Sequence, residues 1–134
     1  MNKLLFTSFI FLTFVACTEE PNTPTYEDEL LHGRWELTDA WRRNKKTEML
    51  IGTYYEFNPT GTMRTNFPSE MDTGDHPYEF DGKIITVNDM ENVFYTIDTL
   101  TESKLIFTTV YSNFPFKLSL IKNDSSGMDP TKEL

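Results

Sequence analysis

The sequence predicts an all-β fold in which eight antiparallel strands close into an up-and-down barrel, with a β-sandwich as the alternative. Two observations support this prediction. Eight short segments between residues 33 and 122 alternate apolar and polar side chains with a period of two, as half-buried strands do. Turn sequences separate these segments and none of them shows a helical stripe, so we expect hairpin connections and not the long crossovers of parallel strands.

The first strand is expected at residues 33–41, where Trp35, Leu37 and Trp41 share one face. The other seven strands are expected, in chain order, at residues 53–57, 62–67, 78–80, 83–87, 93–100, 104–111 and 116–122. We expect their apolar faces to point into the barrel. The predicted inward set consists of Trp35, Leu37, Trp41, Tyr55, Phe57, Tyr95, Ile97, Leu105, Phe107, Phe116, Leu118 and Leu120.

The segments between the strands have the composition of tight turns. The Asn-Pro-Thr-Gly sequence at residues 58–61 and the pair Asp81-Gly82 are strong turn signals, because these residues tolerate the backbone angles that reverse the chain. Residues 88–91 and 101–103 are expected as short polar loops, and Asn113-Phe114-Pro115 is expected to separate the last two strands. This spacing favours strands that pair with their neighbours in the sequence.

The amino terminus has the pattern of a secretory signal peptide at residues 1–16. Lys3 supplies a positive charge, residues 4–16 form a mainly apolar run, and Ala16 is a small residue before the cleavage point. A membrane-spanning helix needs about 20 apolar residues, so this run is too short to cross a bilayer comfortably. The sequence therefore predicts export from the cytoplasm.

The only cysteine of the chain follows this leader. Phe14-Val15-Ala16-Cys17 resembles the lipobox of bacterial lipoproteins, which implies that Cys17 is acylated with diacylglyceryl and palmitate groups and becomes the first mature residue. With a single cysteine the chain can form no internal disulfide bond. Acidic residues after Cys17 resemble the sorting signal of some Gram-negative lipoproteins, so we expect a lipid anchor in the outer membrane, on its periplasmic or cell-surface side.

Composition divides the chain after the signal peptide into three parts, and its net charge bears on the kind of partner. Residues 17–30 read as the lipidated cysteine and a polar tether, residues 31–123 as one barrel domain, and residues 124–134 as a polar carboxyl-terminal tail. The full chain has a net charge of −9. Because nucleic-acid binding needs a basic surface to contact phosphates, this balance argues against a nucleic-acid partner.

The barrel segments resemble a known family. Gly33-Arg34-Trp35 is similar to the Gly-x-Trp signature of lipocalins, and the phrases at residues 55–58, 95–97 and 104–107 resemble the lipocalin-like domains of small bacterial lipoproteins. The resemblance spans roughly residues 31–122. It implies a barrel that the tryptophan closes at one end, commonly beneath an arginine of the last strand; here that strand offers Lys117 and Lys122 instead.

The resemblance and the charge pattern together point to ligand binding. A small barrel either holds one small ligand or is filled by its own side chains. We expect a small apolar or amphipathic ligand in the barrel or at its mouth, where a run of four cations could receive an anionic head group. The alternatives are a solvated turn at this run, and a filled barrel that binds an envelope protein or glycan through its loops. The candidate ligand-binding residues are Trp35, Trp41, Arg42, Arg43, Lys45, Lys46, Tyr55, Phe57, Tyr95 and Phe107.

The sequence predicts no metal site, no cofactor and no catalytic residue. Asp72, Asp75 and His76, with Glu79 nearby, carry possible metal ligands, but their spacing matches no metal-binding loop. His32 is the only other histidine, and the chain contains no nucleophile elbow, phosphate-binding loop or zinc-protease motif. We therefore expect a protein that binds a ligand and does not act as an enzyme.

Overall fold

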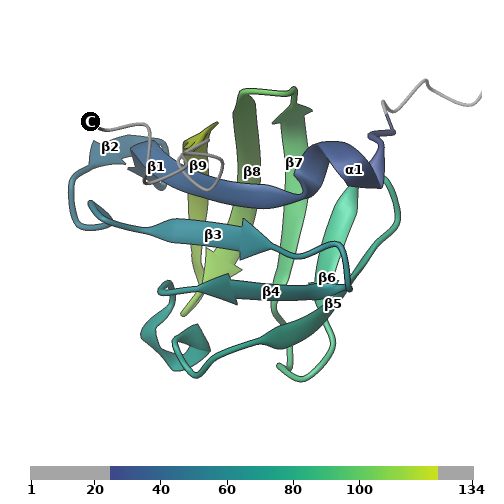
Figure 1. Ribbon diagram of the computed structural model, residues 1–134. Coiled ribbons are helices and arrows are strands. Elements are labelled where there is room, and N and C mark those ends of the chain that lie inside the picture. Colours follow the sequence, from purple (N-terminus) through teal and green to yellow (C-terminus); the bar gives the residue numbers. More distant parts are fainter. Residues whose placement is uncertain (1–24, 124–134) are drawn as a thin grey trace, which may run out of the picture.

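The computed structural model describes residues 25–123 and shows a closed eight-stranded antiparallel barrel (Figure 1). The predicted signal peptide, Cys17 and the predicted tail from residue 124 onward lie outside the described residues. The helices are α1 (Asp28–Leu31) and the 3-10 turn η1 (Ser69–Met71). The strands are β1 (Gly33–Arg42), β2 (Lys45–Thr47), β3 (Tyr54–Phe57), β4 (Thr62–Thr65), β5 (His76–Phe80), β6 (Ile84–Val87), β7 (Phe94–Leu100), β8 (Lys104–Tyr111) and β9 (Phe114–Lys122).

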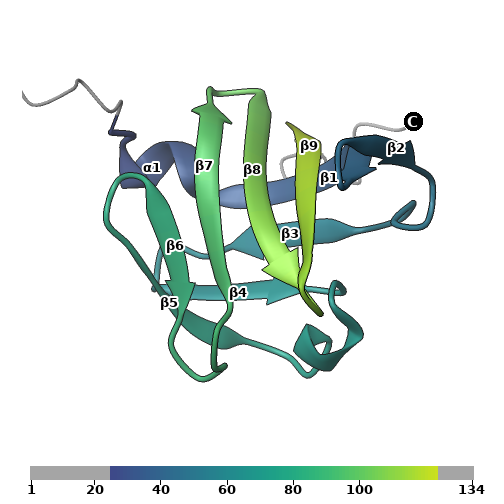
Figure 2. The same cartoon turned by 180° about the vertical axis from the view of Figure 1, so that it is seen from behind.

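The sheet closes because β1 pairs on both of its edges. It is antiparallel to β3 on one side and to β9 on the other, and from β3 to β9 each strand pairs with the next along the chain. Figures 1 and 2 show β1, β3 and β4 crossing one side of the molecule and β6 to β9 the other. The predicted barrel is confirmed, and the continuous hydrogen-bonded circuit excludes the sandwich.

Each of the eight predicted strands corresponds to a barrel strand, but the boundaries differ. The predicted strand 62–67 ends at Thr65, because the Asn66 side chain accepts a hydrogen bond from the Tyr54 backbone N–H (3.0 Å) in place of a continued ladder. The extra strand β2 pairs only with the end of β1 and is too short to give an alternation signal. The two short helices were not predicted either.

The predicted inward position of Trp41 is wrong. The pairing of β1 with β9 shifts register between Leu37 and Asp39, which marks a β-bulge. An extra residue in a strand turns every later side chain to the opposite face. Ala40 therefore faces the core and is 1% exposed, whereas Trp41 is only partly buried and lies near the exposed Lys117, whose Nζ is 5.8 Å from the indole ring centroid.

The closed end of the barrel is built around Trp35, which is completely buried. Its indole N–H donates to the Leu31 carbonyl oxygen (2.9 Å), and the Lys122 ammonium of β9 lies 5.1 Å from its ring centroid. Gly33 has φ of +121°, and a Cβ atom there would lie 2.8 Å from Lys122 Cε. Gly33 thus leaves room for the lysine side chain that lies over the tryptophan.

The chain before β1 lies against the barrel. The Tyr26 backbone N–H donates to the Gly82 carbonyl oxygen (2.7 Å), and the Tyr26 hydroxyl donates to the Asp98 carbonyl oxygen (2.8 Å). Leu30 packs against the core, and Leu31 is fully buried. Residues 25–30, which the sequence assigns to the tether, therefore contact the folded domain.

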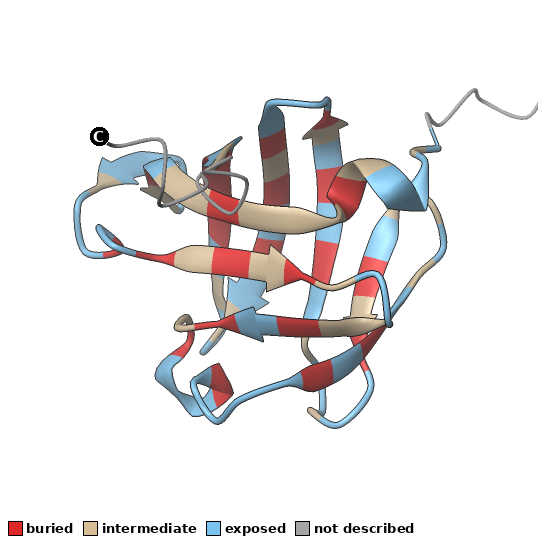
Figure 3. Cartoon of the chain, in the orientation of Figure 1, coloured by how far each residue is buried: buried red, intermediate tan, exposed pale blue. Residues whose placement is uncertain are grey.

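Figure 3 shows buried and exposed residues alternating along the strands, as the period of two requires. The buried side chains form one cluster in the barrel interior. None of the helices within residues 25–123 is long and apolar enough to cross a bilayer.

Candidate functional site

The middle of the barrel is filled by aromatic rings. Tyr55, Phe57, Tyr95 and Phe107 are each at most 1% exposed. The Tyr55 ring meets the Tyr95 and Phe107 rings edge to face, with centroids 5.3 and 5.0 Å apart, and Tyr95 meets Phe107 at 5.0 Å. Edge-to-face pairs of this kind add about 0.5–1.5 kcal/mol to the effect of burial. In this conformation these four predicted ligand-binding residues contact one another and form a packed core.

Two buried hydroxyl groups lie inside this core. The Tyr55 hydroxyl donates to the Phe67 carbonyl oxygen (3.2 Å), whereas the Tyr95 hydroxyl has no hydrogen-bond partner within the described residues. Burial raises the pKa of both tyrosines, so both stay neutral and able to donate a hydrogen bond. A buried unpaired hydroxyl costs about 1–3 kcal/mol, so Tyr95 is the polar group in the interior that would gain most from a bound water or ligand atom.

Aromatic rings also lie across the open end. Phe67 contacts Tyr111 and Phe116 edge to face, with centroids 5.7 and 5.6 Å apart. Phe67 follows β4 and belongs to the segment that leads into η1, where Met71 is fully buried. This segment folds over the barrel mouth, and its Phe67 carbonyl accepts the hydrogen bond from Tyr55 beneath it.

His76 holds this segment in place. Its Nε2 lies 2.7 Å from the Met71 carbonyl oxygen and 3.2 Å from the Thr73 hydroxyl, and its Nδ1 lies 2.9 Å from Asp89 Oδ2. The side chain is 4% exposed. Sequence reasoning considered His76 as a metal ligand and missed this role, because Asp89 lies in a different loop.

Asp75, the sequence neighbour of His76, has its own ion-pair partner. Asp75 pairs with Arg64 of β4, and this ion pair holds the pKa of the Asp75 carboxyl below its usual value. No cluster of three metal-ligating side chains occurs within residues 25–123. This geometry does not test whether the protein is an enzyme, so the absence of catalytic activity stays a prediction.

The four predicted cations gather at the β1–β2 hairpin. Arg43 and Asn44 form its turn with φ of +49° and +63°, the left-handed angles typical of tight hairpins. We call Arg42, Arg43, Lys45 and Lys46 the basic cluster. The cluster spans the end of β1 and the added strand β2, which is not one of the eight barrel strands. Trp41 lies next to it in sequence but does not line its cavity.

The basic cluster lines a cavity of about 320 Å³ together with Thr47, Met49 and Phe114. The Arg42 and Arg43 guanidinium carbons lie 3.9 and 4.3 Å from the Phe114 ring centroid. Lys46 pairs with Asp39 (3.0 Å), whereas no carboxylate within the described residues pairs with the other three cations. Sequence reasoning found the cations but not Phe114, which comes from the distant β8–β9 hairpin.

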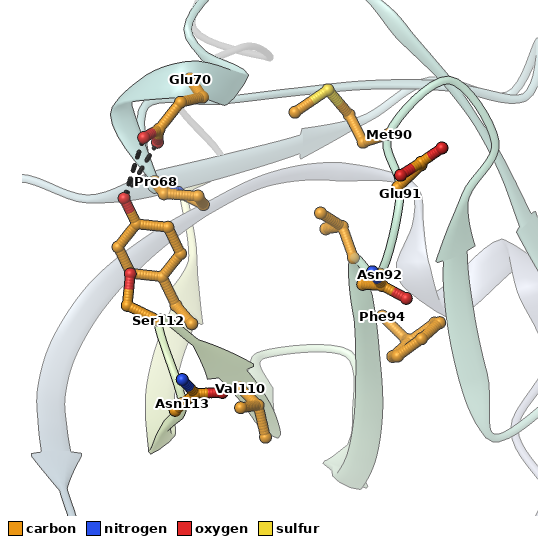
Figure 4. A pocket seen from close by; sticks show the side chains of 11 residues that line it. Pro68, Glu70, Met90, Glu91, Asn92, Phe94, Val110, Ser112 and Asn113 are labelled. Carbon is orange, nitrogen blue, oxygen red and sulfur yellow. Dashed lines mark hydrogen bonds between the residues drawn. The ribbon is translucent and has the colours of Figure 1, made fainter.

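A second cavity of about 430 Å³ lies near the tip of the same hairpin (Figure 4). Its walls come from residues 68 and 70 near η1, residues 90–94 before and in β7, and residues 110–113 of the β8–β9 hairpin. None of the predicted site residues lines it. No sequence pattern indicates this cavity, because three segments far apart in the chain form it.

Comparison with known proteins identifies the fold. No family model matches the chain, and no curated protein matches it. A solved structure does match: a lipocalin-like protein from Bacteroides uniformis, with a TM-score of 0.50 and 16% sequence identity, covering 70% of this chain and 99% of that chain. The fold is lipocalin-like. This likeness shows the fold alone, so a ligand must be argued from the cavities.

Proposed function

We propose that this lipocalin-like protein is a lipid-anchored binding protein of the cell envelope that binds a small amphipathic ligand at the open end of its barrel. The basic cluster receives the anionic head group of the ligand. The apolar part lies against Phe114 and Met49, the apolar residues of the same cavity. No chemical step is proposed.

The observation that supports this proposal is the cavity itself. Three cations that pair with no carboxylate of residues 25–123 surround a cavity with an aromatic wall, in a chain of net charge −9. Cations that pair with no protein carboxylate are available to an anion, and arginine binds carboxylates and phosphates through two parallel hydrogen bonds. Met49 is 78% exposed, so an apolar tail can reach its side chain.

The anchor and the envelope location are supported by the lipobox-like sequence at Cys17 and the leader before it. Two acyl chains hold a protein stably on a membrane, whereas one holds it only marginally. An anchored protein of this type binds its ligand close to the membrane surface. Amphipathic molecules concentrate there.

The filled interior favours a second function. Because aromatic rings occupy the middle of the barrel, the protein could act as an interaction module that binds an envelope protein or glycan through its loops. Native mass spectrometry of the purified chain distinguishes the two functions. A small molecule that co-purifies supports the ligand-binding protein, and an empty chain that binds a defined envelope glycan supports the module.

Calorimetric titration with dodecyl phosphate, below its micelle concentration, tests the basic cluster directly. We expect Arg43→Glu to weaken binding about tenfold, because it removes one charge-assisted contact and adds a repulsive charge. Lys104→Glu is the matched control, since it makes the same charge change at an exposed position of β8. Equal losses in the two variants, or no loss in either, would reject the basic cluster as the head-group site.

A further inference from the structure

The cavity in Figure 4, which we call the rim cavity, has the size of a small-molecule site. Its volume of about 430 Å³ lies within the range of about 300–1,000 Å³ that is usual for ligand pockets. Figure 4 shows Glu70 and Glu91 on opposite sides of it, with Phe94 and Val110 along its edge. The residues come from three loops that meet at the open end.

The rim cavity is distinct from the barrel interior. Phe94 and Val110 are 50% and 62% exposed, whereas their neighbours Tyr95 and Thr109 are buried and face inward. The Thr109 hydroxyl donates to the Phe94 carbonyl oxygen (2.8 Å), which ties the two strands together beside the cavity. A ligand in the rim cavity therefore contacts the outer side of the wall and need not displace the aromatic core.

The charge of the rim cavity is opposite to that of the basic cluster. Two carboxylates, Glu70 and Glu91, line it, and among the described residues no lysine, arginine or histidine does. The Tyr111 hydroxyl donates to both oxygens of Glu70, at 3.0 and 3.1 Å, and so orients this carboxylate. Glu91 has no hydrogen-bond or ion-pair partner among residues 25–123 and is free to approach a cation.

We propose that the rim cavity binds a small organic ammonium ion that carries an apolar body. The apolar body lies on Phe94 and Val110, and the ammonium group pairs with the oriented Glu70 carboxylate, while Glu91 on the opposite side adds negative charge. An aromatic face and carboxylates both attract a cation, whereas an anion would be repelled by the two glutamates. The oriented Glu70 carboxylate favours the cation at little additional cost in side-chain entropy.

The test uses three probes of similar size: 2-phenylethylammonium, the neutral 2-phenylethanol and the anionic phenylacetate. Each is titrated into ¹⁵N-labelled protein that begins at residue 17 and carries Cys17→Ser, so that the whole described barrel is present and cannot be acylated. We expect the ammonium ion to bind about fivefold more tightly than the alcohol, as exposed ion pairs allow. We expect its chemical-shift changes at residues 68–71, 90–94 and 110–113.

Three variants separate the two parts of the site. Glu70→Gln with Glu91→Gln should make the ammonium ion bind no better than the alcohol, while Phe94→Ala should weaken both probes alike. Glu102→Gln, at an exposed position between β7 and β8, is the control and should leave the preference unchanged. Equal binding of ammonium ion and alcohol to the unmodified site, or shifts confined to other residues, would overturn the proposal.

This site does not depend on the basic cluster. Arg43→Glu, which should impair binding of dodecyl phosphate, should leave 2-phenylethylammonium binding unchanged or slightly stronger. Loss of the ammonium preference in the double variant Glu70→Gln with Glu91→Gln, with dodecyl phosphate binding intact, would establish two separate sites on the open end.

Discussion

Trp35 and Trp41 belong to the same strand, yet their surroundings differ. Trp35 is fully buried beneath Lys122 and donates a hydrogen bond to Leu31, while Trp41 is only partly buried and lies near Lys117. The bulge in β1 accounts for this difference, because it turns the second tryptophan away from the core. The two residues are therefore expected to contribute very differently to stability.

We predict that Trp35→Ala lowers the free energy of unfolding by about 3–5 kcal/mol, as large aromatic deletions in a core do. Trp41→Ala should cost about 1 kcal/mol or less, because its side chain remains partly solvated. Urea unfolding followed by far-UV circular dichroism measures both values without relying on tryptophan fluorescence.

The chain contains two tryptophans, so fluorescence offers a second readout. In Trp41→Phe, the remaining Trp35 should emit at short wavelength and resist quenching by acrylamide. In Trp35→Phe, Trp41 should be quenched readily. Equal quenching in the two variants would mean that Trp41 faces the barrel interior after all.

Lys122 shows how one residue can replace another at the closed end. The lipocalin resemblance implies an arginine over the tryptophan, and here a lysine ammonium lies 5.1 Å from the ring centroid. The φ of +121° at Gly33 and the absence of a Cβ there leave the space for the lysine stem. The Gly-x-Trp signature is thus explained by the geometry of three residues from the two strands that close the barrel.

At the scale of the elements, the β5–β6 hairpin is the clearest case in which local sequence decides structure. Asp81 Oδ1 accepts hydrogen bonds from the backbone N–H groups of Lys83 (2.8 Å) and Ile84 (2.6 Å), and Gly82 supplies φ of +95°. The Ile84 and Lys83 hydrogen bonds hold the pKa of the Asp81 carboxyl below its usual value of 3.8. The charged carboxylate therefore stabilises the turn.

We predict that Asp81→Ala lowers the free energy of unfolding by about 1 kcal/mol at neutral pH. The pKa of this carboxyl is lower in the folded state, so its stabilisation is fully present above the unfolded pKa and is lost as the pH falls through the folded pKa. The difference between Asp81→Ala and the parent protein should therefore shrink below about pH 4. Unfolding by urea at several pH values from 7 to 2.5 measures it.

Asp72→Ala serves as the control for this experiment, because Asp72 is exposed and its carboxylate accepts no hydrogen bond within the described residues. It should change stability by less than about 0.5 kcal/mol at every pH. A pH-independent loss in Asp81→Ala would show that the aspartate supports the turn by its shape and not by its charge.

The β1 bulge is an element that the sequence did not reveal. A bulge requires only one extra residue in a strand, and Thr38 and Asp39 carry no composition that marks it. For this reason the sequence pattern predicts that Trp35, Leu37 and Trp41 share one face of the strand. The partner strand β9 and the closure of the barrel decide where the register shifts.

At the scale of the whole molecule, the proposed anchor and the barrel are separate parts of one chain. The lipobox-like sequence ends at Cys17, and the barrel begins its contacts at Tyr26 through Gly82 and Asp98. The anchor can therefore be removed without disturbing a described contact of the barrel.

We predict that the protein fractionates with membranes and incorporates an alkyne-labelled palmitate analogue when it is expressed in a Gram-negative host. Cys17→Ser should abolish the labelling, because the thiol that accepts the diacylglyceryl group is missing. Intact-mass analysis of the membrane fraction should show a chain that begins at residue 17 and carries acyl chains. A chain that retains residues 1–16 with an unmodified Cys17 would remove the basis for the envelope location.

The sequence by itself determined the features that depend on neighbours along the chain. These are the eight strands with their period of two and the turns at residues 58–61 and 81–82. The tryptophan at the closed end followed from the lipocalin resemblance, and the export leader stays a prediction. Alternation and turn chemistry act over a few residues, so they can be read without knowledge of the partners.

Only the tertiary structure decided which space remains for a ligand. Whether the rings of Tyr55, Tyr95 and Phe107 leave a cavity depends on how separate strands bring them together, and they fill the interior. The placement of Phe114 under two arginines and of Tyr111 against Glu70 depends on loops that meet across the barrel mouth. Such contacts follow from the closure of β1 on β9, which no local pattern encodes.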